Sequence, residues 1–324
     1  MRAVEIFELT GPDTGTRVAD VPEPAAADGV VIVEVKAAGV SFPELLQTRG
    51  EYQYKPELPF VPGSEVCGVV RSAPDGSGFS PGDKVVAFCL QGGFAEVAAA
   101  PLAMTFALPD GLDFAQGAAL ILNYHTAYFA LVTRGRLKAG ESVLIHGAAG
   151  GVGTATIQVA KGLGARVIAV VSSDDKAVVA KDAGADEVVR SDGAWKDEVL
   201  ALTGGEGVDI VVDPVGGDRF TDSLRSLNRA GRLVVVGFTG GGIPEVKVNR
   251  LLLRNTEVVG AGWGEYLLSS GLTYGAEVAV EIAKLAAGGH INPPVGARFP
   301  LERAGEALSM LDTRQATGKV VLEP

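Results

Sequence analysis

The sequence predicts an α/β protein in which a β-rich domain accompanies a doubly wound parallel sheet. Three observations favour this fold class. The length of 324 residues is enough for two domains. Residues 1–120 contain short alternating segments separated by turn signals, whereas strands and helices alternate after residue 132. At Val143–Gly153 an apolar run enters a glycine-rich turn, as in a dinucleotide-binding βαβ unit.

Composition excludes some classes of partner. The chain is 47% hydrophobic and 21% charged, which is ordinary for a globular protein. Its net charge of −11 disfavours nucleic acid and anionic membranes, because both would repel the average field of the chain. The amino terminus carries Glu5 and Glu8 and lacks the apolar core of a signal peptide. The two cysteines, Cys67 and Cys89, lie in apolar surroundings, which favours buried free thiols and a cytoplasmic location.

The first 120 residues are expected to form the β-rich domain. Turn signals such as Pro74-Asp75-Gly76 separate its alternating segments. An uncharged run at 114–133 approaches membrane-spanning length, but polar residues interrupt it and favour a buried helix over 114–132. Strands are predicted at Ala3–Leu9, Val30–Ala37, Glu65–Arg71, Lys84–Phe88 and Ala95–Ala99.

The second domain is predicted to hold six parallel strands, because apolar runs alternate with helical segments. The strands are expected at Val143–His146, Arg166–Val171, Glu187–Val189, Val208–Val212, Arg232–Val236 and Glu257–Ala261, with helices near 152–163, 175–183, 194–203 and 217–229. Two helices, Tyr274–Gly288 and Leu301–Leu311, and a strand at Lys319–Leu322 close the chain. We therefore expect a β-rich domain of residues 1–122 and 265–324 around a dinucleotide-binding domain of residues 123–264.

The turn after the first parallel strand has the spacing Gly147-x-x-Gly150-x-x-Gly153, because Ala148 replaces the first glycine of the usual fingerprint. Gly150 would let the backbone approach a pyrophosphate, and Gly153 would let helix and strand pack closely. The helix amino terminus offers unpaired N–H groups to phosphate. The alternative is a purely structural tight turn. A nucleotide site is expected at Gly150, Gly151, Val152 and Gly153.

The end of the second parallel strand favours NADPH over NADH. An NAD-specific unit places an acidic residue there to bind the ribose hydroxyls, whereas this chain has Ser172 and Ser173. Lys176 and Arg190 would supply positive charge for a 2′-phosphate. The acidic pair Asp174-Asp175 opposes this preference. The alternative is that Lys176 and Arg190 are solvated surface charges.

Several short segments spread over the chain carry a resemblance to a known family. They are Ala38–Pro43, Arg49–Tyr52, Pro59–Glu65, Pro81–Val85, Tyr124–Tyr128, His146–Gly153, Asp213–Gly217, Gly237-Phe238 and Gly318–Val321. Together they are similar to segments of the zinc-independent quinone oxidoreductases (NADPH:quinone reductases) of the medium-chain dehydrogenase/reductase superfamily. The resemblance implies a GroES-like β-barrel catalytic domain made from both termini, a Rossmann domain, and a cofactor in the cleft between them.

Zinc is not expected. The zinc alcohol dehydrogenases of the superfamily place a catalytic cysteine where this chain has Val40-Ser41 and a histidine where it has Gly63-Ser64-Glu65. Two cysteines also cannot form their cysteine-rich structural zinc site. Hydride transfer without a metal needs an acceptor that is already electron-poor, such as a quinone or an α,β-unsaturated carbonyl.

The resemblance also implies roles for single residues. Tyr52 matches a position that projects a phenol into the substrate cleft, and Ser41 stands where many relatives carry asparagine, so both are candidate catalytic residues. A half-buried packing tyrosine is the alternative for Tyr52, and Ser41 keeps a hydroxyl but lacks the second donor of the amide. His146 is expected to be structural, because family members often keep a histidine there without proton chemistry. Further cofactor contacts are implied at Thr126, Gly237, Phe238, Asn249 and Lys319.

The leading function is therefore an NADPH-dependent quinone reductase. An enoyl or alkenal double-bond reductase would use the same hydride and the same phenol donor. A nucleotide-binding protein with little turnover is the alternative from a different class. A homodimer is expected through Glu257–Ala261, since this strand lies at a sheet edge in the predicted order and relatives pair there.

Overall fold

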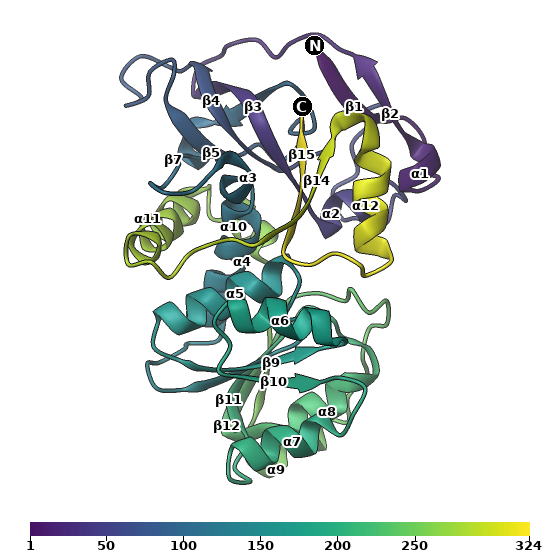
Figure 1. Ribbon diagram of the computed structural model, residues 1–324, viewed down its shortest axis with the longest axis vertical. Helices are drawn as coiled ribbons and strands as arrows, with labels where there is room; N and C mark the ends of the chain where they lie inside the picture. Colours follow the sequence, from purple (N-terminus) through teal and green to yellow (C-terminus); the bar gives the residue numbers. More distant parts are fainter. The chain divides into compact units, whose positions relative to one another are not determined.

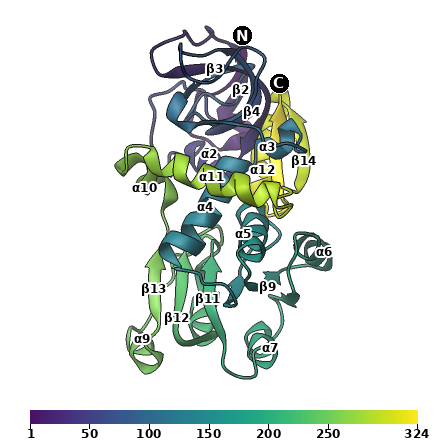
Figure 2. The ribbon, with the colours of Figure 1, turned by 90° about the vertical axis from the view of Figure 1, so that its left-hand side faces the viewer.

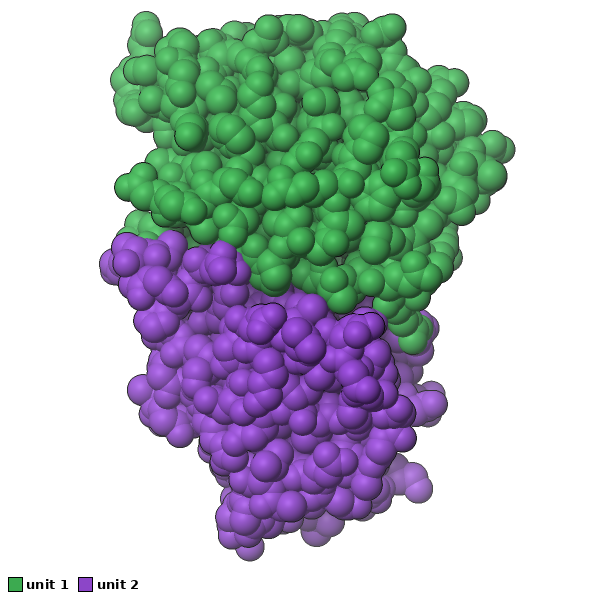
Figure 3. Space-filling model, viewed as in Figure 1, with its two compact units in different colours: residues 1–122, 271–283, 293–324 green, residues 123–270, 284–292 purple.

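The computed structural model describes residues 1–324 and divides into two compact units, which Figure 3 colours separately. Unit 1 comprises Met1–Leu122, Gly271–Ala283 and Pro293–Pro324, and unit 2 comprises Asn123–Ser270 and Lys284–Asn292. The expected division differs at 265–270 and 284–292. The second difference has a physical cause, because the Gln158 amide accepts from Asn292 N–H at 2.9 Å and donates to its carbonyl at 2.8 Å.

Unit 1 is built on a seven-stranded mixed sheet. Its order is β14 (Val295–Pro300), β15 (Lys319–Glu323), β3 (Val30–Val40), β4 (Glu65–Ser72), β5 (Lys84–Phe88) and β7 (Thr105–Ala107), and β6 (Val97–Pro101) also pairs with β3. β14 and β15 run parallel, and the other pairs are antiparallel. A separate antiparallel pair joins β1 (Arg2–Ile6) to β2 (Thr16–Asp20). Both ends of the chain therefore belong to unit 1 (Figure 1).

The core of unit 1 lies between this sheet and its helices. Val33, Val66 and Val85 from three strands share one buried cluster with Leu308 of α12 (Ala304–Asp312). α12 also packs on α1 (Pro12–Gly15), α2 (Phe42–Gln47) and β14, as Figure 2 shows for β14. Leu45 of α2 belongs to the same cluster. The position of α2 is thus fixed by its packing on the sheet.

Unit 2 is a six-stranded parallel sheet, which confirms the predicted α/β fold class. Its order is β10 (Glu187–Arg190), β9 (Arg166–Val171), β8 (Ser142–Ile145), β11 (Val208–Asp213), β12 (Leu227–Val235) and β13 (Glu257–Gly260). The first strand along the chain, β8, lies in the middle of the sheet. The following strands, β9 and β10, are added on one side of it, and β11, β12 and β13 are added on the other, so the order reverses between β8 and β11. In such sheets ligands bind outside the carboxyl ends of the strands at the switch point.

Helices cover both faces of this sheet (Figure 1). α5 (Gly151–Gly162) and α6 (Asp174–Asp182) pack on β8, β9 and β10. On the other face, Leu144 and Ile168 share a buried cluster with Trp195 of α7 (Trp195–Leu202) and Phe220 of α8 (Phe220–Arg225). The remaining helices are α9 (Asn249–Arg254), α10 (Trp263–Ser269) and α11 (Thr273–Ala287), with 3-10 turns at Leu102–Met104, Gly217–Arg219 and Leu301–Arg303.

Two predicted helices differ from the structure. The segment expected as one helix over 114–132 is α3 (Phe114–Gly117), α4 (Thr126–Tyr128) and two π-helical stretches, Leu120–His125 and Phe129–Arg134. The helix expected over 217–229 ends at Arg225, because Leu227 already pairs with Val208 in the sheet. No helix combines the length and the apolar character needed to cross a membrane.

Candidate functional site

The glycine-rich turn lies at the switch point of the parallel sheet, between β8 and α5. Gly147 has a φ of 58°, a left-handed conformation that favours glycine. A Cβ atom on Gly153 would lie 2.2 Å from the Gly147 carbonyl oxygen, so close packing of helix and strand requires glycine there. A Cβ on Gly150 would meet only that oxygen, at 3.5 Å. Gly150 therefore presents an open backbone at the start of α5.

The start of α5 can hold a phosphate. Gly150 is its N-cap and supplies no side-chain cap, so the first N–H groups of the helix have no side-chain partner. Gly150, Gly151 and Val152 are half-buried, whereas Gly153 is buried. A Cβ on Gly151 would also lie 2.4 Å from the Asn123 amide nitrogen. The open backbone N–H groups at this helix start could hold a pyrophosphate group.

A second cluster lies where β9 and β10 end. Ser172 follows β9, and the Lys176 ammonium donates to its hydroxyl at 3.4 Å. The Arg190 guanidinium, at the end of β10, donates to the Ser172 carbonyl at 3.2 Å. Ser173 is the N-cap of α6 and accepts from the Lys176 N–H at 3.4 Å. The structure thus brings four predicted cofactor residues to one place.

Two carboxylates also occupy this cluster. Arg190 donates to Asp192 at 2.9 Å and forms an ion pair with Asp174. These neighbours raise the pKa of the guanidinium, above all through the hydrogen bond that it donates to the Asp174 carboxylate. The sequence indicated the opposing charge of Asp174 but not the role of Asp192, which lies two residues beyond Arg190. Both cations are therefore held by protein groups rather than solvated separately.

The turn after β11 completes the carboxyl edge of the sheet at the switch point. One oxygen of the buried Asp213 carboxylate accepts from the N–H groups of Val215 and Gly216, at 2.8 and 2.9 Å. A Cβ on Gly147 would lie 3.1 Å from the Val215 side chain, so this turn packs against the glycine-rich turn. The sequence did not indicate that Asp213 fixes this turn, because an aspartate at a strand end often merely caps or is solvated.

The remaining cofactor candidates of unit 2 are spread more widely. Gly237 follows β12, and the ring of Phe238 covers Gly216, where an added Cβ would lie 2.8 Å from the ring. Phe238 is 37% exposed. Thr126 begins α4 and is half-buried, and Asn249 is exposed at the start of α9. Phe238 therefore lies beside the switch point.

His146 has a structural environment, as predicted from its place at the end of β8. It is fully buried, its Nε2 lies 2.8 Å from Ser223 Oγ, and its ring lies edge-on to Trp195 at 5.0 Å between centroids. Ser223 donates its own hydroxyl proton to the Arg219 carbonyl. Burial lowers the pKa of His146 to about 4. The imidazole is thus neutral near pH 7 and donates from Nε2 to Ser223.

The catalytic candidate Ser41 belongs to a buried polar cluster in unit 1. It is the N-cap of α2, and the Lys319 ammonium donates to its hydroxyl oxygen at 2.6 Å. Lys319 also forms an ion pair with Glu65. Lys319 and Glu65 are 3% and 1% exposed. Lys319 was expected to line the cofactor, and in unit 1 its ammonium is held by Ser41 and Glu65.

Glu44 extends this cluster. Its carboxylate accepts from the N–H groups of Ser41 and Ser64, at 3.1 and 3.0 Å, and from the Ser64 hydroxyl. Burial raises the pKa of Glu44, although the Ser64 hydroxyl and the charge of Lys319 act in the opposite direction. The segment Gly63-Ser64-Glu65 was noted in the sequence, so two residues of this cluster could be identified from it. The hydrogen bonds between Ser64 and Glu44 could not, because they depend on the packing of α2.

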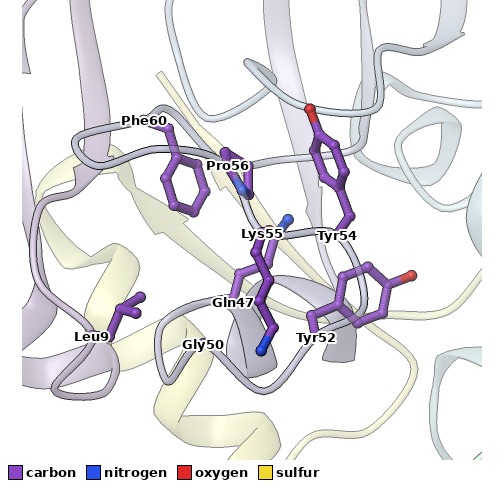
Figure 4. Close-up of a pocket in the computed structure, with 8 residues that line it drawn as sticks. All are labelled: Leu9, Gln47, Gly50, Tyr52, Tyr54, Lys55, Pro56 and Phe60. Atoms are coloured by element: carbon purple, nitrogen blue, oxygen red, sulfur yellow. The ribbon is translucent and has the colours of Figure 1, made fainter.

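Tyr52 lines a cavity of about 110 Å³ in unit 1 (Figure 4). The side chain is half-buried, and in Figure 4 its hydroxyl points away from Gln47 and Gly50. Burial raises the pKa of the phenol, and the charge of Glu44 adds to this effect. The phenol is therefore a hydrogen-bond donor at neutral pH. The cavity is lined by Leu9, Gln47, Gly50, Tyr52, Tyr54, Lys55, Pro56 and Phe60.

No group of three or more His, Cys, Asp or Glu side chains is arranged to hold a metal ion. At the positions where zinc relatives have ligands, Ser41 and Ser64 bind Lys319 and Glu44 instead. Cys67 and Cys89 are free and buried, and burial raises the pKa of both thiols. Neither thiol is available as a thiolate ligand at neutral pH.

Two family models match the chain. Residues 27–110 match the alcohol dehydrogenase GroES-like domain, and residues 151–276 match the zinc-binding dehydrogenase model. Among curated proteins, the quinone oxidoreductase of Rattus norvegicus is 35% identical over 326 residues, covering 99% of this chain and 97% of the relative.

Solved structures are similar over the whole chain. A probable oxidoreductase from Mycobacterium abscessus is 49% identical with a TM-score of 0.91, covering 100% of this chain and 99% of the other. A mycobacterial protein solved in complex with NADPH is 35% identical with a TM-score of 0.90 and covers 100% of both chains.

Proposed function

The chain belongs to the quinone oxidoreductase family of the medium-chain dehydrogenase/reductase superfamily, and from this membership we propose that it reduces quinones with NADPH and without a metal ion. It is an oxidoreductase that uses NADPH. The observation that carries the proposal is the position of Lys176 and Arg190 on either side of Ser172, because only NADPH has a 2′-phosphate.

The residues of unit 2 fit this cofactor. Gly150 leaves open backbone at the start of α5, where the pyrophosphate would receive N–H groups. The hydroxyls of Ser172 and Ser173, with Lys176 and Arg190, would hold the 2′-phosphate through charge-assisted hydrogen bonds. When bound, NADPH supplies a hydride to the substrate.

A hydride added to an electron-poor carbonyl compound leaves negative charge on its oxygen. The Tyr52 phenol and the Ser41 hydroxyl are the donors of unit 1 proposed to stabilise that charge. The overall change moves one hydride from NADPH and one proton from solvent to a quinone, and leaves NADP⁺ and hydroquinone. A Lewis acid is not needed, because a quinone accepts hydride without prior activation by a metal.

Independence from zinc is supported by the chemistry of the donor set. Serine hydroxyls are poor zinc ligands, and the Lys319 ammonium beside Ser41 would repel a divalent cation. We expect elemental analysis to find no stoichiometric zinc and chelation to leave turnover unchanged. About one zinc per chain, or activity lost on chelation and restored by zinc, would contradict this part of the proposal.

Absorbance loss of NADPH with a panel of small quinones and enals tests the reaction. Faster turnover with quinones is expected. Preference for enals would assign the chain as a double-bond reductase instead. Oxidation of NADPH by neither class, with tight NADPH binding, would indicate a binding protein with little turnover.

A homodimer formed through β13 and a cytoplasmic location complete the proposal. β13 lies at the edge of the parallel sheet, and Val258 on it is 38% exposed. Leu252 and Leu253 on neighbouring α9 are 76% and 77% exposed, so apolar surface accompanies the open edge. Free thiols at Cys67 and Cys89 support a reducing compartment.

A further inference from the structure

The surroundings of the Ser41 hydroxyl leave one direction in which it can donate a hydrogen bond. Lys319 Nζ donates to Ser41 Oγ at 2.6 Å, and in the capping box of α2 the same oxygen faces the Glu44 backbone N–H. The hydroxyl oxygen accepts a hydrogen bond from Lys319, and the positive end of the Glu44 N–H dipole also faces it, so the hydroxyl hydrogen is repelled from both sides. The hydroxyl hydrogen must therefore point away from Lys319 and from α2. No acceptor within the chain takes it.

The cation behind this hydroxyl is built into the core of unit 1. Lys319 and Ser41 are 3% and 7% exposed, and Glu65 pairs with the ammonium. A Cβ on Gly39 would lie 2.6 Å from the Glu65 carboxylate and 2.7 Å from Lys319 Cε. Glycine at position 39 is thus what allows the ammonium and the carboxylate to meet beside β3.

A buried cation bound to a hydroxyl oxygen makes its hydrogen a stronger donor. The ammonium withdraws electron density from the oxygen, and little water is present to screen the effect. Ser41 is also held by Lys319 at its hydroxyl oxygen and by the Glu44 carboxylate at its backbone N–H, so little reorientation is needed when the hydroxyl donates. These are the properties of a preorganised donor for an oxygen that gains negative charge.

We propose that Lys319 is a positioning residue that acts through Ser41, fixing and polarising its hydroxyl as the donor to the carbonyl oxygen of the hydride acceptor. The inference rests on the proposed function in one respect, because it requires a carbonyl substrate. It gives Lys319 a role on the substrate side of the reaction rather than on the cofactor.

A purely structural ion pair is the alternative, and a double-mutant cycle separates the two. The charge is removed by Lys319→Met together with Glu65→Gln, so that no carboxylate is left buried without a partner. The hydroxyl is removed by Ser41→Ala. The two changes and their combination are compared with the wild type for kcat and KM with a quinone, for the NADPH Kd and for Tm.

Ser41→Ala is expected to lower kcat about 100-fold, and the paired Lys319 and Glu65 change about tenfold. The combined variant should fall no further than Ser41→Ala alone, because Lys319 acts through the hydroxyl that is already missing. The NADPH Kd should stay within about twofold. If the two losses multiply in the combined variant, or if the NADPH Kd rises in parallel with the loss of kcat, the inference is wrong.

Removing any buried ion pair can lower stability, so a control must show that this loss of stability alone does not lower kcat. Arg232 and Glu141 form such a pair in unit 2 at 2.8 Å, with side chains 10% and 19% exposed, at the amino-terminal end of the parallel strands. Arg232→Met with Glu141→Gln should lower Tm and leave kcat unchanged. If the Lys319 and Glu65 variant does not fold, the same cycle is run with Lys319→Gln and Glu65→Gln, because the shorter glutamine at position 319 removes the charge and keeps N–H donors that can pair with the amide at position 65.

The proposed function and this inference fail in different ways. A wild type that oxidises NADPH with neither quinones nor enals would refute the proposed function. An active wild type in which the losses multiply would refute only the role of Lys319.

Discussion

Arg190 donates a hydrogen bond to the Asp192 carboxylate at 2.9 Å, and its guanidinium also pairs with Asp174. These carboxylates occupy two donors that a 2′-phosphate would use, and a third donates to the Ser172 carbonyl, so the Nε–H and one Nη1–H are left of the five N–H groups. Both acidic side chains are largely exposed, so solvent screens each ion pair and a phosphate can displace it. Binding of NADPH must therefore compete with the protein's own acidic residues.

The first prediction follows from this competition. Asp192→Asn should tighten NADPH binding by about two- to fivefold, because it frees Arg190 and removes a negative charge beside the phosphate. NADH binding should not change. Titration calorimetry with each cofactor measures both. Asp197→Asn on α7, another exposed aspartate, changes the net charge equally and should leave both affinities unaltered; unchanged or weaker NADPH binding in Asp192→Asn would contradict the prediction.

The second prediction concerns Lys176, whose ammonium lies 3.4 Å from the Ser172 hydroxyl. Lys176→Ala should weaken NADPH binding by roughly 1.5–3 kcal/mol, the scale of a charge-assisted hydrogen bond, and leave NADH nearly untouched. Lys181→Ala at the other end of α6 is the matched control. Equal losses for both cofactors would show that Lys176 acts on something other than the 2′-phosphate.

The parallel sheet could be predicted from sequence because its strands are buried on both faces. A strand buried on both faces appears in the sequence as a continuous apolar run. One of these runs is Arg166–Val171, and β9 covers the same residues in the structure. β2, at Thr16–Asp20, was missed, because it is half-exposed and mixes charged with small residues. The helix predicted over 217–229 was too long. β12 already begins at Leu227, but the polar and small residues 228–231, where the register shifts and Ala230 has a φ of 59°, separate Leu227 from the apolar run that follows.

The candidate site could be predicted only where its residues are neighbours in sequence. Gly150 and Gly153 belong to one turn, and Ser172 and Lys176 to one strand end, so their spacing carried the information. Ser41 and Lys319 are 278 residues apart and meet because β15 pairs with β3. Neither local propensity nor motif spacing contains that pairing.

The third prediction tests the Tyr52 phenol. Tyr52→Phe keeps the ring on the cavity wall and removes the hydroxyl donor, so kcat should fall about tenfold to a thousandfold while the NADPH Kd stays nearly constant. Steady-state kinetics with a quinone measures this. Tyr54→Phe in the same loop loses a 3.1 Å hydrogen bond to Gln91 and should change kcat far less. An unaltered kcat in Tyr52→Phe would assign the side chain to packing.

The fourth prediction tests the edge of the parallel sheet. The wild type should have a mass near twice the chain mass of 33.2 kDa at micromolar concentration, as measured by light scattering. Val258→Lys places a charge on β13 and should give monomers, because a lysine at a strand edge opposes pairing with a second copy. Val280→Lys, on exposed α11, should remain dimeric. A monomeric wild type would rule out the dimer.

The fifth prediction concerns the pH dependence of stability that arises from His146. Burial lowers its pKa to about 4 in the folded protein, whereas an unfolded chain has a histidine pKa near 6.5. Between these values the unfolded state binds more protons, so the free energy of unfolding falls as pH decreases from about 6.5 to 4. Above pH 6.5 the imidazole is neutral in both states and the contribution vanishes.

The full loss attributable to His146 is about 3 kcal/mol, from the difference of the two pKa values. His146→Gln keeps an N–H donor for Ser223 and cannot take up a proton, so its free energy of unfolding should fall less between pH 6.5 and 4 than that of the wild type. Urea denaturation at a series of pH values measures the slope. His290→Gln is the control, because His290 is exposed and its removal should leave the slope unchanged. Equal slopes for His146→Gln and the wild type would mean that His146 is as easily protonated in the folded state as in the unfolded chain.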